Sequence, residues 1–500
     1  MASPFCWSCL SQLRPAPRAL PSSASVTQTA PFHTTAALGM SALMKKKNKN
    51  VTPNFRNPTA FRMKKVKQPE RTRAPPVEEQ RAMAKRIVLS NPNALEVEGM
   101  KDLSPETMGD ESLRGSILGL PTPMLDQLRA AGAFKPKQGW GIFRRPGTVM
   151  RHDALEMGKM MDGVTGDGAN KGKAFKKIVT GAKGTGKTVH LAQAMTMALL
   201  KGWVVFTVPE AQDLVLGSTS YAPLPDTNPM KYVQPDATVE LLSRAAAANG
   251  EVLSSLRVSR EHRSVGAPAK PGMTLMELAQ LGIRNRSTAW GVFQALWAEL
   301  TATSAAPGHE KHFSPRPPML VTVDSLAHWM KESAYRTPEF EPIHAHDLAI
   351  VNHFVSLLKP GAQQSSLPNG GLLLYALSAS NKPSVYAFDV ALKQLEARKA
   401  GVDRSSPEFP QPDPYRRPDM RVIDALSSPK PKDAKEGALE VQSLGGLTRE
   451  ETQNYMEYFA RSGILREKVD ALSVSEKWTL AAGGVVGELE KLGKRVRTMA

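Results

Sequence analysis

The chain has 500 residues and a hydrophobic fraction of 41%, which is enough to bury a substantial core and suggests two or three domains. No window of about 18 apolar residues occurs, so the sequence gives no indication of a membrane span. The formal net charge of +18 is unevenly distributed, because the first acidic residue is Glu70 and the 69 residues before it carry eleven lysines and arginines. A basic N-terminal arm of this kind fits an organellar address, an anionic partner such as RNA, or both.

Residues 1–44 have the composition of a mitochondrial transit peptide. They combine Arg14 and Arg18 with many serines, threonines and alanines and no acid, and they lack the continuous apolar centre of a secretory signal. The alternative is a disordered cytosolic tail. Cys6 and Cys9 form a C-x-x-C pair inside this segment, and the chain has no other cysteine to complete a metal site, so we expect no role for them.

Residues 45–90 form a basic segment with few apolar side chains. Such a segment cannot fold alone, but it can lie along phosphates and become ordered on contact; a solvated linker is the alternative. Residues 91–400 are expected to form the main domain, with an N-terminal extension and a helical insertion at 210–315. A proline-rich connector at 401–437 and a C-terminal helical domain at 438–500 would follow.

The most specific motif is GAKGTGKT, which has the spacing of a phosphate-binding loop (P-loop). It follows the apolar end of a predicted strand, Ile178 and Val179, and opens a helical stretch, as such a loop requires. Its backbone N–H groups would surround the phosphates, its lysine would add a positive charge, and its threonine hydroxyl would complete the coordination of Mg²⁺. A glycine turn before a helix is the alternative. The candidate nucleotide-binding residues are Gly181, Ala182, Lys183, Gly184, Thr185, Gly186, Lys187, Thr188, Val189 and Asp324.

Asp324 enters this set because it ends an apolar run. Val204 to Val208 and Met319 to Val323 read as buried parallel strands, and a further strand is expected at Leu372 to Leu377. An acid at the end of a strand downstream of a P-loop can bind Mg²⁺ opposite Thr188, which is the Walker B role; a helix N-cap is the alternative. We therefore expect Thr188 and Asp324 to be the protein ligands of the metal.

Other polar residues near these strands carry weaker predictions. Ser378, Ser380 and Asn381 follow the strand at 372–377, where related folds place a residue that senses the γ-phosphate, although such residues also make simple turns. His344, His346 and His353 lie near Asp347, but a solvated or capping role is expected rather than metal binding.

The insertion and the C-terminal domain are expected to be helical. Helices are predicted over 236–256 and 274–303, where Trp290, Phe293 and Trp297 recur at core spacing. Thr448 and Glu451 have the spacing of a capping box, and a last helix is expected from Ser473 to Leu492.

The residues needed to hydrolyse a nucleotide are less evident in the sequence than the residues needed to bind one. Hydrolysis usually needs an acid that orients water and an arginine that neutralises the γ-phosphate. Asp324 is followed by Ser325, and the nearest acid onward is Glu332. We therefore expect slow hydrolysis at most, and we assign no catalytic residue.

The ordered set GAKGTGKT, WVVFTVPEA, LVTVDSLAHW, GGLLLYALSAS and EETQNYMEYFARSGIL, together with the transit peptide, resembles the death-associated protein 3 family of mitochondrial small-subunit ribosomal proteins. The resemblance covers roughly Gly147 to Leu492. It implies an α/β P-loop fold akin to AAA ATPases, with a parallel sheet flanked by helices, and a bound GTP or GDP, although the residues do not exclude ATP. It also implies contacts with small-subunit rRNA, with neighbouring ribosomal proteins and with the large subunit, in the mitochondrial matrix.

Two functions of different class remain open. The first is a nucleotide-binding structural component of the small subunit of the mitochondrial ribosome. The second is a mitochondrial AAA-like ATPase that remodels a protein or RNA partner, with the C-terminal helices acting as a lid. The basic arm and the missing hydrolytic acid favour the first.

Overall fold

The structure is a computed structural model that describes residues 86–494, apart from 137, 263–264, 266–268, 308, 360–365 and 428–437. The predicted transit peptide with its two cysteines and nearly all of the predicted basic arm lie outside the described residues. None of the helices described is long and apolar enough to cross a lipid bilayer.

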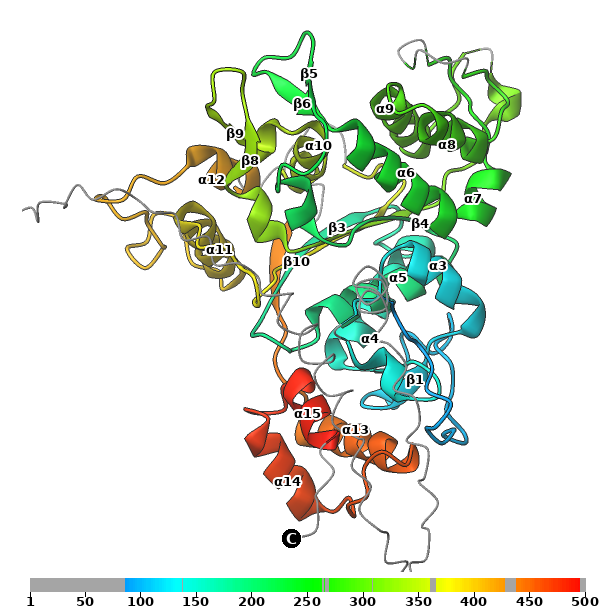
Figure 1. Ribbon diagram of the computed structural model, residues 1–500, viewed down its shortest axis with the longest axis vertical. Coiled ribbons are helices and arrows are strands. Elements are labelled where there is room, and N and C mark those ends of the chain that lie inside the picture. Colours follow the sequence, from blue (N-terminus) through cyan, green and yellow to red (C-terminus); the bar gives the residue numbers. More distant parts are fainter. Residues whose placement is uncertain are drawn as a thin grey trace, which may run out of the picture. The chain divides into compact units, whose positions relative to one another are not determined.

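A five-stranded parallel sheet forms the centre of the described chain, in the order β11-β3-β10-β7-β4. Figure 1 labels three of its strands, β3, β4 and β10. Its strands are β3 (Ala174–Thr180), β4 (Val204–Val208), β7 (Met319–Asp324), β10 (Gly371–Ala376) and β11 (Leu439–Ser443). The prediction of an α/β fold with a parallel sheet flanked by helices is confirmed, and four of the strands are those expected. The fifth, β11, was not predicted.

The strands β3, β4, β7 and β10 send alternate side chains into two apolar layers, as the period of two in a β-strand requires. In β4, Val204 and Phe206 belong to one layer and Val205 to the other. The helices α4 (His152–Thr165) and α5 (Lys187–Leu200) cover the face of Val205. On the opposite face lie α6 (Pro235–Ala248), α10 (Ala349–Leu358) and α11 (Tyr386–Lys399), as Figure 1 shows for α5 and α6. Burial on both faces explains why these strands read as continuous apolar runs.

The register of the sheet brings two distant segments to one edge. Ala376 of β10 pairs with Val179 of β3 on one side and with Asp324 of β7 on the other. Since all the strands are parallel, the loop that follows β3 and the carboxylate that ends β7 lie at the same carboxyl edge, with one strand between them. This is the edge at which ligands bind in open α/β sheets.

The described residues of the insertion between β4 and β7 contain four α-helices where the sequence predicted two long ones: α6, α7 (Gly250–Ser255), α8 (Leu275–Arg284) and α9 (Ala289–Leu300). The first break falls at Asn249, whose side chain donates to the carbonyl of Val205 and accepts from its N–H, at 2.9 and 2.7 Å. The side chain thus fixes the junction of α6 and α7 to β4. The predicted core role of Phe293 and Trp297 is confirmed, since both rings are buried and contact Phe206.

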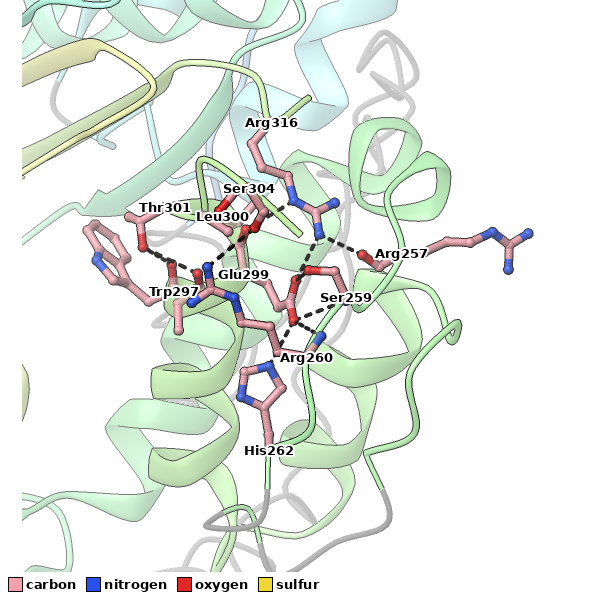
Figure 2. Close-up of polar contacts among 12 residues, drawn as sticks. Arg257, Ser259, Arg260, His262, Trp297, Glu299, Leu300, Thr301, Ser304 and Arg316 are labelled. Carbon is pink, nitrogen blue, oxygen red and sulfur yellow. Dashed lines mark hydrogen bonds and ion pairs between the residues drawn. The ribbon is translucent and has the colours of Figure 1, made fainter. Parts of the chain in front are cut away.

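A buried carboxylate fastens the far end of the insertion. Glu299 of α9 accepts hydrogen bonds from the backbone N–H groups of Ser259 and Arg260, at 3.1 and 2.9 Å, and from Oγ of Ser259 at 2.8 Å (Figure 2). Nε2 of His262 lies 3.0 Å from Oε1 of Glu299, and Nη2 of Arg316 donates to Oε2 of Glu299 at 2.8 Å. Both Glu299 and Arg316 have fully buried side chains.

The remaining elements are short and lie in connections. The strand pairs are β1 (Ile117–Gly119) with β2 (Gly147–Val149), β5 (Ala222–Leu224) with β6 (Lys231–Val233), and β8 (Glu332–Arg336) with β9 (Pro342–His344). Two further helices are α3 (Leu125–Ala130) before the sheet and α12 (Met420–Leu426) after the irregular residues 402–419.

The C-terminal part is helical and contacts the segment before the sheet. Its helices are α13 (Arg449–Arg461), α14 (Ala471–Leu480) and α15 (Val486–Gly493), and Phe459 of α13 contacts Phe143. The capping box of Thr448 and Glu451 is confirmed. The single helix predicted from Ser473 to Leu492 is wrong, because the chain turns at Gly483 and Gly484, both with φ near +80°.

Candidate functional site

The loop Gly181–Gly186 connects β3 to α5 and turns three times through positive φ. Gly181, Gly184 and Gly186 have φ of +137°, +84° and +95°. A Cβ on Gly181 would lie 2.4 Å from the carbonyl oxygen of Leu444, which follows β11. The motif therefore needs glycine here for backbone conformation and for the close approach of the neighbouring chain.

The N-terminus of α5 begins directly at this loop, with Lys187 as its first residue. Its unpaired N–H groups form a positive end where an anion is favoured. Nζ of Lys187 donates to the carbonyls of Gly181 and Ala182, at 2.8 and 2.7 Å. Burial lowers the pKa of Lys187, and the nearby charge of Asp324 opposes that effect. The ammonium thus lies folded over its own loop, where phosphate oxygens would be stronger acceptors than carbonyls.

Thr188 and Asp324 meet as predicted. Oγ1 of Thr188 donates to Oδ2 of Asp324 at 2.8 Å, and the carboxylate is buried. The other oxygen, Oδ1, accepts from the N–H of Ser325, which has φ of +68° and so turns the chain away from the strand. A hydroxyl and a carboxylate at this distance are a pair of hard oxygen ligands that can share a divalent cation.

Lys135 and Glu210 complete this polar cluster, and the sequence analysis named neither of them. Nζ of Lys135 lies 2.6 Å from Oδ2 of Asp324 and 3.3 Å from Oε2 of Glu210. Burial alone would lower the pKa of Lys135, but the charges of Asp324 and Glu210 together raise it. Glu210 directly follows Pro209 after β4, the strand beside β7, and its place after an apolar strand was the signal that could have found it.

These groups line a cavity of about 1080 Å³, a volume at the upper end of ordinary ligand sites. The loop, the start of α5 and Asp324 form one side of its lining. Residues before the sheet and residues of the C-terminal helices form the other, including Thr148, Tyr455 and Glu490. The cavity is also lined by three polar residues that follow β10, namely Ser378, Ser380 and Asn381. The structure thus places these predicted residues in the same cavity as the loop. Glu332, by contrast, is exposed on β8.

Two contacts connect the loop to the rest of the cavity wall. Nη1 of Arg151 donates to the carbonyl of Thr185 and its Nη2 to that of Gly445, each at 2.8 Å. The N–H of Gly487 on α15 donates to the carbonyl of Gly184 at 2.9 Å. Any ligand that orders the loop is therefore coupled directly to the C-terminal helices. No local sequence pattern marks Arg151 for this role.

The histidines of the chain form no metal site in the part that the structure describes. Nδ1 of His344 accepts from the backbone N–H of His346 at 3.1 Å, which is the predicted capping role. Among the described residues, no group of three or more histidines, cysteines, aspartates or glutamates is placed to hold a metal ion. A metal at Thr188 and Asp324 would thus take most of its ligands from a bound molecule and from water, as Mg²⁺ commonly does.

Residues 148–492 match the family described as Mitochondrial ribosomal death-associated protein 3. The chain belongs to this family. It is also 39% identical over 442 residues to the Small ribosomal subunit protein mS29 of Neurospora crassa, an alignment that covers 88% of this chain and 87% of the relative. The matched region contains the loop, Asp324 and the C-terminal helices, and it excludes Lys135.

Proposed function

We propose that this protein is a structural component of the small subunit of the mitochondrial ribosome that retains a purine nucleotide, GTP or GDP, in the cavity above its glycine-rich loop. The ribosomal part follows from membership of the family and from the close relative in the small subunit. Its place is accordingly on the mitochondrial ribosome. Nucleotide binding is our proposal, and under it the P-loop motif of the sequence binds the phosphates of the nucleotide.

The observation that carries the nucleotide proposal is the meeting of Thr188 and Asp324 beside the loop. The sequence separates these residues by more than a hundred positions, yet Oγ1 and Oδ2 lie 2.8 Å apart at the start of α5. A glycine loop, a helix N-terminus, a lysine and this oxygen pair are the groups that a nucleoside phosphate with Mg²⁺ requires. When bound, Mg²⁺ would neutralise charge on the phosphate oxygens, with Thr188 and Asp324 as its protein ligands.

The cavity lining contains a candidate residue for recognising the base of the nucleotide, Glu490. This residue lies on α15, and its Oε1 accepts from Nζ of Lys494. A carboxylate can also accept hydrogen bonds from both N1–H and the 2-amino group of guanine, which would replace Lys494 as its partner. Adenine presents no such pair of donors. The preference for guanine, which the family resemblance implies, thus has a residue to which it can be assigned.

The nucleotide is proposed to act as a brace. The loop contacts Arg151 through Thr185 and α15 through Gly184, so ordering the loop also fixes the helices that end the described chain. A ligand present at a hundred times its dissociation constant stabilises the folded state by about 2.7 kcal/mol. This effect needs no turnover.

The proposed partners are the small-subunit rRNA, adjacent ribosomal proteins and, across the subunit interface, the large subunit. The basic N-terminal arm, with eleven lysines and arginines before Glu70, supports an RNA contact, because neutralising backbone phosphates dominates such binding.

A remodelling ATPase is the second candidate, favoured by Asp324 and by the helices α13 to α15 beside the loop. Sedimentation after a high-salt wash separates the two functions. A structural component stays with the small subunit and releases little phosphate, whereas a remodelling enzyme leaves the subunit and turns over nucleotide. Loss of the protein in the wash together with rapid turnover would contradict our proposal.

A further inference from the structure

The ammonium of Lys135 lies where a divalent cation would bind. Oδ2 of Asp324 accepts from Oγ1 of Thr188 at 2.8 Å and from Nζ of Lys135 at 2.6 Å. These two oxygens are the ones that would hold Mg²⁺ in a P-loop site. One of them is therefore already shared with a positive charge supplied by the chain.

The chain holds Lys135 firmly in this place. It belongs to the connection between α3 and β2, before the loop in sequence, and its backbone N–H donates to Oε1 of Gln138 at 2.8 Å. The same oxygen accepts from Nε1 of Trp140, a buried ring, at 2.6 Å. Both ends of the lysine are thus fixed, the backbone by Gln138 and the ammonium by carboxylates.

Glu210 gives the ammonium a second carboxylate, at 3.3 Å. A cation between two carboxylates in a partly buried site is strongly favoured, because removing it would leave two negative charges unpaired. A hydrated Mg²⁺ would have to displace this ammonium from Asp324 or accept a position farther from it. Mg²⁺ also requires near-ideal octahedral geometry, so it tolerates such a shift poorly.

We propose that Lys135 is a resident cation that competes with Mg²⁺ for Asp324, so that the site retains nucleoside phosphates with little dependence on Mg²⁺. This inference rests on the proposed nucleotide binding. In the bound state, Lys135 and Lys187 together supply positive charge that the metal supplies elsewhere. Slow turnover follows, because the metal ions of active hydrolases bridge and neutralise the β- and γ-phosphates and a lysine does so less completely.

The test is the affinity of the purified full-length protein for fluorescently labelled GDP, measured in excess Mg²⁺ and in excess EDTA. For the wild type we expect the two dissociation constants to agree within about threefold. For Lys135→Met, which frees Asp324 for the metal, we expect affinity in EDTA to be at least about tenfold weaker than in Mg²⁺.

The matched control is Lys201→Met. Lys201 is also a largely buried lysine that pairs with an aspartate, Asp162, but it lies at the far end of α5 from the loop. We expect this variant to show the Mg²⁺ dependence of the wild type. Should Lys135→Met fail to fold, the affinities of the wild type in Mg²⁺ and in EDTA are sufficient to test the proposal.

The two proposals can fail separately. Nucleotide binding by the wild type that weakens tenfold or more in EDTA would overturn the role of Lys135 and leave the proposed function intact. An equal Mg²⁺ dependence of nucleotide affinity in the wild type and in Lys135→Met would also overturn the role of Lys135 and leave the proposed function intact. A wild type that binds no nucleotide in either buffer would overturn both.

Discussion

Two buried carboxylates in this protein have opposite surroundings. Glu299 in the insertion is fully buried, and both of its carboxylate oxygens accept hydrogen bonds from the residues packed around it. Arg316 and His262 approach it from two sides (Figure 2). Asp324 at the edge of the sheet also has hydrogen-bonding partners, Thr188 and Lys135, but it lines a cavity of about 1080 Å³. The first carboxylate is closed to any ligand, and the second can exchange partners.

The difference shows how a buried charge can be assigned to structure or to binding. Burial alone would raise the pKa of Glu299, but the hydrogen bonds from His262 and Ser259 and the charge of Arg316 lower it below its ordinary value. Such a carboxylate is fully satisfied, so its role is to fasten the insertion. At Asp324 the neighbouring groups include a lysine over its own loop and a helix N-terminus, which an incoming anion can use. The predictions below test this contrast, beginning with the largest expected effect.

Glu299→Gln should destabilise the protein by about 3–5 kcal/mol, because it leaves the buried guanidinium of Arg316 without a counter-charge. Chemical denaturation measures the change. The matched control is Glu457→Gln, which removes an exposed pair with Arg461 and should change the free energy of unfolding by no more than about 0.5 kcal/mol. Similar small effects of both variants would show that the closed cluster does not fasten the insertion.

Acid should destabilise both regions through buried histidines. Burial lowers the pKa of His190 on α5 and of His353 on α10 from 6.5 to about 4. Between these values the unfolded chain binds protons that the folded chain does not, so the free energy of unfolding falls as the pH falls from about 6.5 to 4 and levels off below. Each histidine should contribute about 3 kcal/mol, at about 1.4 kcal/mol per pKa unit.

Denaturation series between pH 7 and pH 4 measure this slope. His353→Leu, which replaces a side chain packed against Phe293 and Trp297, should reduce it. An unaltered slope would mean that His353 is protonated in the folded protein and that its surroundings are more polar than the structure indicates.

Lys187→Ala should weaken nucleotide binding at least a hundredfold, or about 2.7 kcal/mol, because it removes the charge that would face the phosphates of a bound nucleotide. Equilibrium titration with labelled GDP measures this, and thermal unfolding without nucleotide checks that the fold survives. The control is Lys173→Ala, an exposed lysine just before β3. Equal nucleotide affinities of the two variants would show that the loop does not form part of the binding site.

Glu490→Gln should reduce the preference for GDP over ADP by about tenfold, or about 1.4 kcal/mol, because an amide cannot accept from both guanine donors. Competition titrations give the ratio. Glu488→Gln, which also removes a carboxylate paired with a lysine on the same helix but lies outside the cavity lining, should leave it unchanged. A preserved preference in Glu490→Gln would assign the reading of the base to another residue.

The sequence was most informative where a short pattern determines local structure. Four buried strands follow from apolar runs, and the loop follows from the spacing of its glycines. Asp324 follows from the rule that an acid after such a strand lies at the carboxyl edge. Thr188 and Asp324 could be paired in advance because parallel strands bring these ends together.

The rest depended on contacts that no local pattern encodes. β11 has only five residues, of which Glu440 and Ser443 are exposed, and it follows a proline-rich stretch, so its sequence lacks the long apolar run of the central strands. Lys135 reaches the site from the connection between α3 and β2, and Arg151 reaches it as the N-cap residue of α4, so the direction of both side chains depends on tertiary packing. The pair Gly483 and Gly484 is a turn signal inside the helix predicted over 473–492, and the prediction did not take it into account.

The most direct test of the account is the identity and amount of nucleotide carried by the protein. Full-length protein and salt-washed small subunits would be denatured, and the released nucleotides identified and counted by mass spectrometry. The account predicts about one guanine nucleotide per chain, retained through the wash without continuing phosphate release. A preparation that carries no nucleotide while the protein remains folded in the subunit would contradict it.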